Sequence, residues 1–389
     1  MSEAPPPRRL TIALVIEDVN MRGGQERVIG ELAPRLAARH EVHLFCHTVA
    51  DIPLDDITVH RVRAIRAPLG PRAMWFALAS SLAARGGKYD VVLSQGGNTL
   101  AQNFALVHTC HRDRRRVRLD IERRWRLKSP LRRAWEAGRD ALFARLERRA
   151  VRRCRGRVIA ISQDVKRYLM REYGLATGDI HVAPNGVDHE RFRPDPTGLH
   201  RDRIRGELGL AGDDFVALFM GGLWFEKGLP SLLEALALTD HASHLVVVGS
   251  GDVERFGEMA RESGVADRVH FVPHVTDPEA WYNMADCLVH APAVEPFGLV
   301  MVEAAACGLP LLATRAGVAL DLIEDGVSGF FIERDDPAGI ARGLDRLAAD
   351  PELRRNMSER LRNRSLQFDW DRQAEQIEAV FLAGLEGGS

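Results

Sequence analysis

The stretch CLVHAPAVEPFGLVMVE, residues 287–303, contains one complete unit of the expected fold. A short apolar run at 287–291 comes first, a Pro-Phe-Gly turn follows at 296–298, and Leu299, Val300 and Val302 then open an apolar helix. A continuous apolar run that ends in a turn is typical of a parallel strand covered on both faces. We therefore expect a strand, a turn and a helix in this order.

The same alternation recurs along most of the chain, with helical segments such as 280–285, after the expected cap Asp277, between the strands. It predicts two doubly wound, Rossmann-like α/β domains, as a length of 389 residues also suggests. The expected break lies near 185–210, which is rich in Pro, Gly and Asp. The expected strands are 11–16, 42–45, 91–94, 104–108, 158–161, 215–220, 244–250, 269–272, 287–291 and 311–314.

Composition and cysteine usage describe a soluble globular enzyme. The chain is 46% hydrophobic and 28% charged, and its mean hydropathy is -0.17. Its five cysteines are scattered and never spaced as C-x-x-C, which argues against disulfides or a zinc site and favours a reducing cytoplasm. The Pro-rich start does not resemble a secretory signal, and charged residues, Gly and Pro interrupt the apolar tract 299–320, so we expect no membrane span.

Charge is distributed unevenly along the chain. Residues 1–190 carry 34 Lys and Arg against 21 Asp and Glu, whereas the remainder carries 19 against 33. The segment 112–157 alone has 19 basic and 6 acidic residues, with Trp125, Trp135 and Phe143 among them. A solvated helical face explains only part of such an excess, so we expect a surface for an anionic membrane or a phosphate-bearing acceptor. Nucleic acid would need the same charge, but no nucleic-acid motif accompanies it.

Two post-strand segments of the first half could contact a ligand. Gly23 and Gly24 come just before an expected helix, where free backbone N–H groups could bind a phosphate. For an isolated Gly-Gly pair, however, a plain turn is the favoured reading. His108 stands at an expected strand end and could donate to a sugar hydroxyl. We expect no metal at His108, Cys110 and His111, because alternation along one extended strand would direct His111 to the face opposite the other two, and no second ligand pair lies nearby in the sequence.

The second half offers a glycine turn with a lysine and a pair of carboxylates. Gly222 and Lys227 lie in the turn after 215–220, where a lysine suits a diphosphate. In the opening stretch, Glu295 and Glu303 flank the Phe297–Val300 amides, which form a helix N-terminus suited to a second phosphate contact. Glu303 could accept both hydroxyls of a ribose, while Glu295 would lie nearer the transferred group.

Taken in order, these segments resemble the family 4 glycosyltransferases of the GT-B fold over nearly the whole chain. The matching segments are GGQER (23–27), His108, PNGVD (184–188), EKG (226–228), the Glu295/Glu303 pair with its PFGLV, and DLIEDGVSGF (321–330). The resemblance implies two Rossmann-like domains facing a central cleft, an acceptor-binding one at 1–190 and a nucleotide-sugar-binding one at 191–371. It also implies that the last helix, within 372–389, returns to pack on the first domain.

The resemblance also implies roles for individual residues. Gly23 and Gly24 would approach the diphosphate or the acceptor, His108 the transferred sugar, and Lys227 the departing diphosphate. Glu295 would hold the donor sugar, and Glu303 would hold the ribose. The loop of Pro273, His274 and Val275 would border the base. Phosphate and sugar would be held by the amides of Phe297, Gly298, Leu299 and Val300. Many relatives carry an arginine where this chain has Gly222, so Lys227 would act alone or with another cation such as Arg22 or Arg315.

The expected function is transfer of a hexose, with retention and without a metal or other cofactor, from a nucleotide sugar. A UDP-sugar is favoured and a GDP-sugar comes next. The acceptor would be a hydroxyl of a cell-envelope glycan or a lipid-linked acceptor, with or without a phosphate group, as for enzymes of lipopolysaccharide synthesis. The expected location is the cytoplasm, peripheral on the inner face of the membrane. Two alternatives stay open: a nucleotide-sugar 2-epimerase of the same architecture, and a non-enzymatic protein that binds membrane or nucleic acid.

Overall fold

The computed structural model describes residues 8–21, 23–125 and 129–386. Residues 126–128 of the basic segment and the candidate cation Arg22 lie outside this part. The chain divides into two compact units, which are treated separately below. Unit 1 contains residues up to 116, then 126–185 and 370–389; unit 2 contains 117–125 and 186–369. Residues 117–125, which the sequence placed with the first domain, thus group with the second.

Unit 1 is built on a seven-stranded parallel sheet in the order β5-β3-β1-β6-β7-β8-β9. Its expected strands are present within one or two residues of the predicted ends, and β5 and β9 are additional. The strands are β1 (Thr11–Val15), β3 (Glu41–Cys46), β5 (Ile57–Arg61), β6 (Val91–Gln95), β7 (Phe104–Val107), β8 (Val158–Ala160) and β9 (Ile180–Val182), beside a short pair β2 (Asp18–Val19) and β4 (Thr48–Val49).

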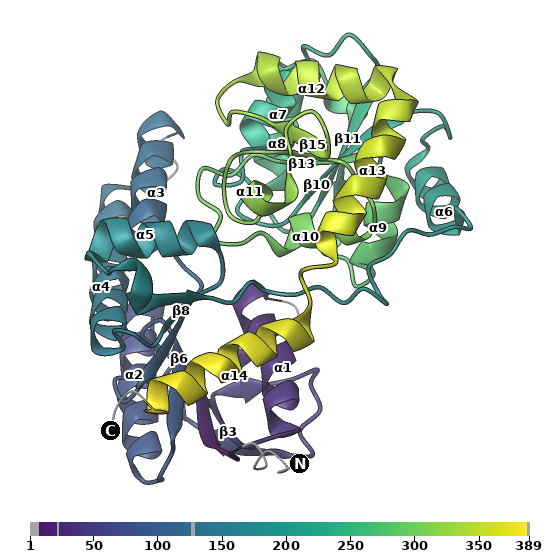
Figure 1. Cartoon of the computed structure of the whole chain (residues 1–389). Helices are drawn as coiled ribbons and strands as arrows, with labels where there is room; N and C mark the ends of the chain where they lie inside the picture. Colours follow the sequence, from purple (N-terminus) through teal and green to yellow (C-terminus); the bar gives the residue numbers. More distant parts are fainter. Residues whose placement is uncertain (1–7, 22, 126–128, 387–389) are drawn as a thin grey trace, which may run out of the picture. The chain divides into compact units, whose positions relative to one another are not determined.

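Helices cover this sheet, and the last helix of the chain is one of them (Figure 1). The helix α14 packs beside α1, and its Phe381 ring meets Phe104 of β7 edge to face at 5.0 Å. Gln373 of α14 also donates to the side chain of Asn185, at 2.8 Å. The helices are α1 (Gly24–Ala37), α2 (Leu69–Arg85), α3 (His111–Trp125, continuing into unit 2), α4 (Pro130–Arg153), α5 (Gln163–Tyr173) and α14 (Trp370–Glu386).

Unit 2 repeats the plan with a six-stranded parallel sheet in the order β12-β11-β10-β13-β14-β15. The expected helix at 280–285 is α9, which begins at Pro278 after Asp277, but the Asp277 side chain bonds Arg203 instead of capping α9. The strands are β10 (Phe215–Met220), β11 (Ser243–Val248), β12 (Val269–Val272), β13 (Cys287–His290), β14 (Leu311–Ala313) and β15 (Gly329–Phe331). The helices are α6 (Leu199–Leu208), α7 (Leu229–Leu236), α8 (Val253–Glu262), α9 (Pro278–Met284), α10 (Leu299–Ala306), α11 (Ala319–Leu322), α12 (Pro337–Ala349) and α13 (Pro351–Ser365).

The core of unit 2 consists of apolar strand residues and the helix faces that cover them. Phe219, Val247 and Val289, from three neighbouring strands, are fully buried in one cluster with Leu233 of α7 and Leu344 of α12. Such continuous apolar strands are stable only where helices cover both faces of the sheet. Within the described residues, no helix is long and apolar enough to cross a membrane.

A buried carboxyl group joins α4 to α5 in unit 1. Glu147 is 1% exposed, and it accepts hydrogen bonds from the hydroxyl groups of Tyr168, at 2.7 Å, and Tyr173. Burial raises the pKa of Glu147 to about 7, although both tyrosine hydrogen bonds act in the opposite direction. Folding therefore takes up a proton at pH values between the unfolded pKa of about 4.3 and the folded one.

We predict that the protein becomes less stable as pH rises from about 5 to 7, with little further change above. The reason is that the pKa of Glu147 is higher in the folded chain than in the unfolded chain, so the stabilisation from its bound proton is lost over this range. A Glu147→Gln variant stays neutral and should lose this part of the pH dependence. Thermal melting of both proteins at several pH values measures it, with Glu190→Gln, at a carboxylate that is 94% exposed, as the control. Parallel melting curves for wild type and Glu147→Gln would contradict the prediction.

Candidate functional site

The candidate site of unit 2 lies between β10 and β13, where the order in which strands are added to the sheet reverses. From β10 the chain adds β11 and β12 on one side and later returns to add β13 to β15 on the other. Ligands of doubly wound sheets bind in the crevice outside the strand ends at such a switch point, because the two flanking loops diverge there. The loops that follow β10 and β13 contain Lys227 and Glu295 respectively.

Gly228 lets these two loops approach each other closely. Its φ angle is +83°, and a Cβ atom at this position would overlap the carbonyl oxygen of Ala291. Only glycine combines that backbone conformation with such a contact. The approach places Lys227 beside Glu295, and the Lys227 ammonium forms an ion pair with Oε2 of Glu295. Two residues that the sequence analysis selected separately thus meet directly.

His290 is the third member of this group, and the sequence analysis assigned it no role. Its Nε2 lies 3.0 Å from Oε2 of Glu295, and the residue is 1% exposed. Its Nδ1 is buried and has no hydrogen-bond partner within the described residues. Because an ionised carboxylate only accepts hydrogen bonds, Nε2 donates to Glu295, and in the neutral ring Nδ1 then carries no proton. The signal that could have identified it is its position as the last residue of β13.

The charge states of the three side chains follow from their surroundings. Burial alone would raise the pKa of Glu295, but the charge of Lys227 and the hydrogen bond from His290 outweigh it and hold the pKa well below the ordinary range. Burial lowers the pKa of His290, and the nearby Lys227 adds to this effect against the hydrogen bond to Glu295. The group is therefore an ammonium–carboxylate pair with a neutral imidazole that orients the carboxylate.

The turn after Glu295 brings a helix N-terminus to the same place. Gly298 has a φ of +93°, and a Cβ there would overlap the Met301 side chain. A second loop holds this turn, because the Val318 N–H donates to the Phe297 carbonyl at 2.7 Å. The first residues of α10 are Leu299 and Val300, and the first N–H groups of a helix have no partner within it. Such a helix end favours an anion.

Glu303 and His274 occupy different environments around this turn. Glu303 is 6% exposed in α10, and the Tyr282 hydroxyl of α9 donates to its Oε2 at 2.8 Å. This bond orients the carboxylate. His274 is exposed, two residues beyond β12. The roles of both residues toward a nucleotide stay predictions.

Gly222, where many relatives carry an arginine, lies in a strained loop. Gly222 is followed by Leu223, which has a φ of +55° although it is not glycine, and Leu223 is 55% exposed. Arg315, considered as a replacement cation, lies over the ring of Phe331 at 3.8 Å from its centroid. Arg334 is attached to the same loop as Lys227, since its Nη2 donates to the Phe225 carbonyl at 2.8 Å.

Unit 1 has its own switch point between β1 and β6, and the glycine pair lies beside it. Gly23 is the N-cap residue of α1, and Gln95 at the end of β6 donates to the Gln25 carbonyl at 2.9 Å. A Cβ on Gly23 would overlap the Glu26 carboxylate, so this acidic side chain covers the helix end. A phosphate there would have to displace it, so the geometry favours the plain turn.

His108 follows the end of β7 and is almost fully buried. Burial lowers its pKa to about 3, and its Nε2 has no hydrogen-bond partner in the part of the chain that the structure describes. A neutral imidazole with an unused nitrogen suits a hydroxyl ligand, and its role toward a sugar stays a prediction. One expectation was wrong: β7 ends at Val107 and α3 begins at His111, so His108 to His111 do not share an extended strand. His111 instead stacks on Phe143 at 5.5 Å.

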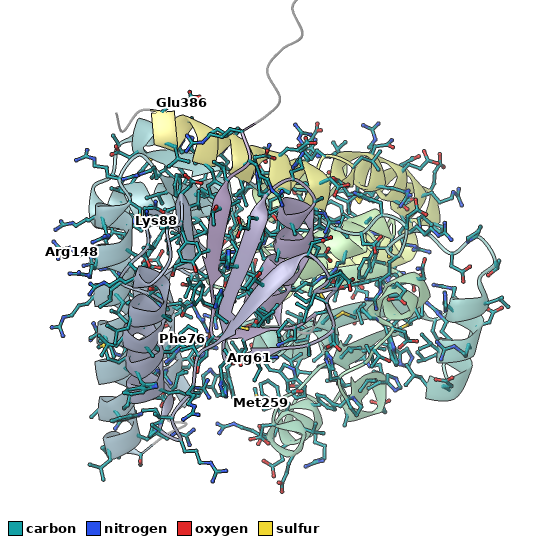
Figure 2. All side chains as sticks on the ribbon, turned by 90° about the horizontal axis from the view of Figure 1, so that it is seen from below. Arg61, Phe76, Lys88, Arg148, Met259 and Glu386 are labelled. Carbon is teal, nitrogen blue, oxygen red and sulfur yellow. The ribbon has the colours of Figure 1, made fainter. Side chains whose placement is uncertain are left out.

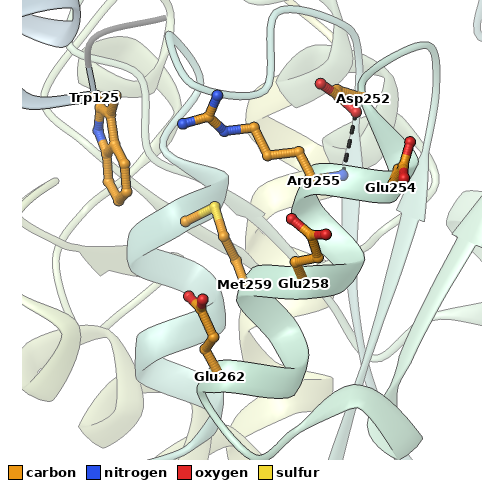
Figure 3. A pocket seen from close by; sticks show the side chains of 7 residues that line it. All are labelled: Trp125, Asp252, Glu254, Arg255, Glu258, Met259 and Glu262. Carbon is orange, nitrogen blue, oxygen red and sulfur yellow. Dashed lines mark hydrogen bonds between the residues drawn. The ribbon is translucent and has the colours of Figure 1, made fainter.

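A hollow of about 410 Å³ also lies beside α8 in unit 2 (Figure 3). Trp125 stands on one side of it, and four acidic side chains line it together with Arg255 and Met259: Asp252, Glu254, Glu258 and Glu262. Asp252 is also the N-cap of α8, accepting from the Arg255 N–H at 3.2 Å. Four carboxylates disfavour a diphosphate in this hollow.

Comparison with known proteins agrees with this architecture. The family model described as Glycosyltransferase Family 4 matches residues 22–191, and that of glycosyl transferases group 1 matches residues 200–364. The chain belongs to the family 4 glycosyltransferases. Its two family segments correspond closely to the two Rossmann-like units, and structural neighbours share the GT-B fold.

The individual proteins that match this chain have low sequence identity to it. D-inositol 3-phosphate glycosyltransferase 1 of Catenulispora acidiphila is 33% identical over 247 residues, 60% of this chain and 58% of that protein, so the match spans little more than half of the relative. The solved structure of WaaG, a glycosyltransferase involved in lipopolysaccharide biosynthesis, has a TM-score of 0.76 at 20% identity, covering 95% of this chain and 99% of that one. HepE of Anabaena, solved in complex with UDP-glucose, gives a TM-score of 0.74 at 21% identity and covers 96% and 100%.

We predict that His290 sets the orientation and ionisation of Glu295. In a His290→Leu variant the carboxylate loses a donor, so its pKa should rise and turnover should fall about 10- to 100-fold, the usual effect of losing a hydrogen bond to a charged group. The acid limb of the pH–rate profile should move to higher pH. His290→Gln, which retains an N–H donor, should recover most of the loss. Leucine and glutamine variants with equal activity and unchanged pH profiles would contradict this role.

Proposed function

We propose that this glycosyltransferase moves a hexose from a nucleotide sugar to a hydroxyl of a cell-envelope glycan or lipid-linked acceptor, with retention and without a metal. The observation that carries the proposal is the group of Lys227, Glu295 and His290 at the switch point of unit 2, next to the N-terminus of α10. It combines a cation, an oriented carboxylate and free backbone donors in one place.

The leaving diphosphate would be stabilised by Lys227 and by the first amides of α10. An ammonium has three N–H donors, so Lys227 can keep its bond to Glu295 and still donate to a phosphate oxygen. Fixed donors of this kind act where negative charge develops as the bond to the diphosphate breaks. They replace a metal in this proposal.

Glu295 would bind hydroxyls of the transferred sugar. Lys227 and His290 both contact its Oε2, which holds the carboxylate in one orientation. An ionised carboxylate accepts hydrogen bonds from sugar hydroxyls and favours positive charge developing on the ring. Retention would then follow from attack on the face that the diphosphate leaves, through an oxocarbenium-like state. Glu303, oriented by Tyr282, would accept the ribose hydroxyls.

The proposed donor and acceptor classes rest on the compared proteins and on the basic segment of the chain. A UDP-sugar is the first choice and a GDP-sugar the second, since a structural neighbour, HepE, was solved with UDP-glucose. A phosphate-bearing acceptor is consistent with relatives named D-inositol 3-phosphate glycosyltransferases and with the basic segment 112–157. We also propose that this segment contacts an anionic membrane surface, which would place the enzyme beside a lipid-linked acceptor.

Removing either charged member of the group should abolish most activity. We expect Glu295→Gln and Lys227→Ala each to lower turnover by about 10²–10³, as for the loss of a single charge-stabilising donor. Transfer from a labelled nucleotide sugar measures it, with Glu324→Gln and Lys166→Ala as charge-matched controls. NMR of the product should show the anomeric configuration of the donor. Full activity in both variants would rule out the assigned site, and an epimerised sugar formed without acceptor would support the epimerase instead.

The donor can be identified by its effect on stability. A ligand that binds only the folded state at 100 times its Kd stabilises it by about 2.7 kcal/mol. We expect a UDP-sugar to raise the melting temperature most among UDP-, GDP- and ADP-sugars, and the increase to shrink in Lys227→Ala and Glu303→Gln. If no nucleotide sugar changes the melting temperature, the non-enzymatic alternative is favoured.

A further inference from the structure

Exposed apolar side chains gather on one helix of unit 1 that the proposed function does not use. Trp75, Leu78 and Leu82 of α2 are 44%, 46% and 69% exposed. They are spaced three and four residues apart, so they lie along one face of the helix. The opposite face is buried and includes Phe76 and Ala77. The helix is therefore apolar on both faces, and solvent covers only one of them.

This apolar stripe is held in place. The Trp75 indole N–H donates to the Arg63 carbonyl at 2.8 Å, which fixes the ring at the start of the stripe. An indole that is polar at one edge and apolar elsewhere is typical of the boundary between water and lipid. Seventeen helical residues extend about 25 Å, enough to lie along a membrane surface.

Basic residues lie within α2 and on both sides of it in the sequence. The helix α2 contains no Asp or Glu, and its two charged residues are Arg72 and Arg85. The preceding segment adds Arg61, Arg63 and Arg66, and Lys88 follows the helix. Some of these arginines have protein partners, such as Glu17 for Arg72 at 2.8 Å, but the excess of positive charge remains.

The neighbouring helix α4 also exposes both apolar and basic side chains. The two helices lie side by side in unit 1 (Figure 1), and the site of a Gly70 Cβ is 3.7 Å from the Arg139 side chain. Two apolar residues of α4 are exposed, Leu131 at 85% and Trp135 at 50%. Arg148 projects from the outer side of α4 (Figure 2). Its other exposed positions include Arg132, Arg133, Arg145, Arg149 and Arg152.

We infer that α2, with the outer side of α4, docks on an anionic lipid surface and inserts Trp75, Leu78 and Leu82 at the headgroup boundary. The apolar side chains match the acyl boundary of such a surface, and the nearby basic residues match its negative headgroups. A second copy of this chain would bring the same cations face to face, which charge repulsion disfavours. The inference rests on the proposed membrane contact of segment 112–157 and adds the element that enters the lipid.

The test compares binding of the full chain to two kinds of vesicle, pure phosphatidylcholine and phosphatidylcholine with about a third phosphatidylglycerol. Sedimentation at low and high salt gives the partition constants. We expect binding to the anionic vesicles only, weakened by salt. A Leu78→Ser/Leu82→Ser variant should lose about tenfold for each leucine, the equivalent of about 1.4 kcal/mol. The matched control is Leu199→Ser/Leu238→Ser, at residues of unit 2 that are 69% and 55% exposed.

A second measurement tests insertion itself. Leu82→Cys labelled with a polarity-sensitive fluorophore should shift to the blue on anionic vesicles, whereas labelled Leu199→Cys should not. Wild-type binding by the α2 double variant, or no blue shift, would overturn the inference. The inference would also be overturned if the wild type formed a dimer without lipid that the double variant does not form, or if it bound an oligonucleotide more tightly than the vesicles.

The failure of this inference can be separated from failure of the proposed enzyme. The α2 variants should keep the donor-induced rise in melting temperature and the transfer to a water-soluble acceptor, since α2 contributes no residue to the switch point of unit 2. If no nucleotide sugar binds the wild type, the enzymatic proposal is refuted, while the vesicle result is unaffected.

Discussion

The contact between the backbones of Gly228 and Ala291 is the constraint on which the functional group depends. These residues belong to the loops after β10 and β13, neighbouring strands at the point where the sheet changes direction. A side chain at position 228 would separate the loops, and Lys227 would then no longer reach Glu295. The parallel sheet sets the distance between the strand ends, and the glycine removes the remaining steric barrier. His290, as the last residue of β13, is brought to Glu295 by the same geometry.

Burial gives this group its chemical character. An isolated buried carboxylate would take up a proton. Here the charge of Lys227 and the hydrogen bond from the neutral His290 imidazole keep Glu295 ionised. The arrangement keeps an oriented negative charge on a side chain that is only 8% exposed. Glu147 shows the contrary case in unit 1: its partners are neutral tyrosines, so burial dominates and raises its pKa to about 7.

Much of the architecture could be predicted from short-range patterns. Continuous apolar runs identified most of the parallel strands, since a strand covered on both faces has no polar side, and the Pro- and Gly-rich segment near 185 marked the change of unit. The strands β5 and β9 escaped this criterion because polar residues interrupt them and most of their residues are partly exposed, and β15 was not predicted either. Extending the strand beyond Val107 was wrong for His108 to His111, because β7 ends at Val107 and a helix begins at His111. The grouping of residues 117–125 with unit 2 also depends on contacts that no local pattern records.

By itself the sequence determined the alternation of strands and helices, the glycines that permit close turns, and the types of functional groups at the strand ends. These properties depend on neighbouring residues, so they can be read locally. Only the tertiary structure decided that Lys227 pairs with Glu295 across 68 positions of the chain, that His290 completes the group, and which face of α2 remains in solvent. A helix that is apolar on every side does not indicate which side is covered, because that depends on what packs against it.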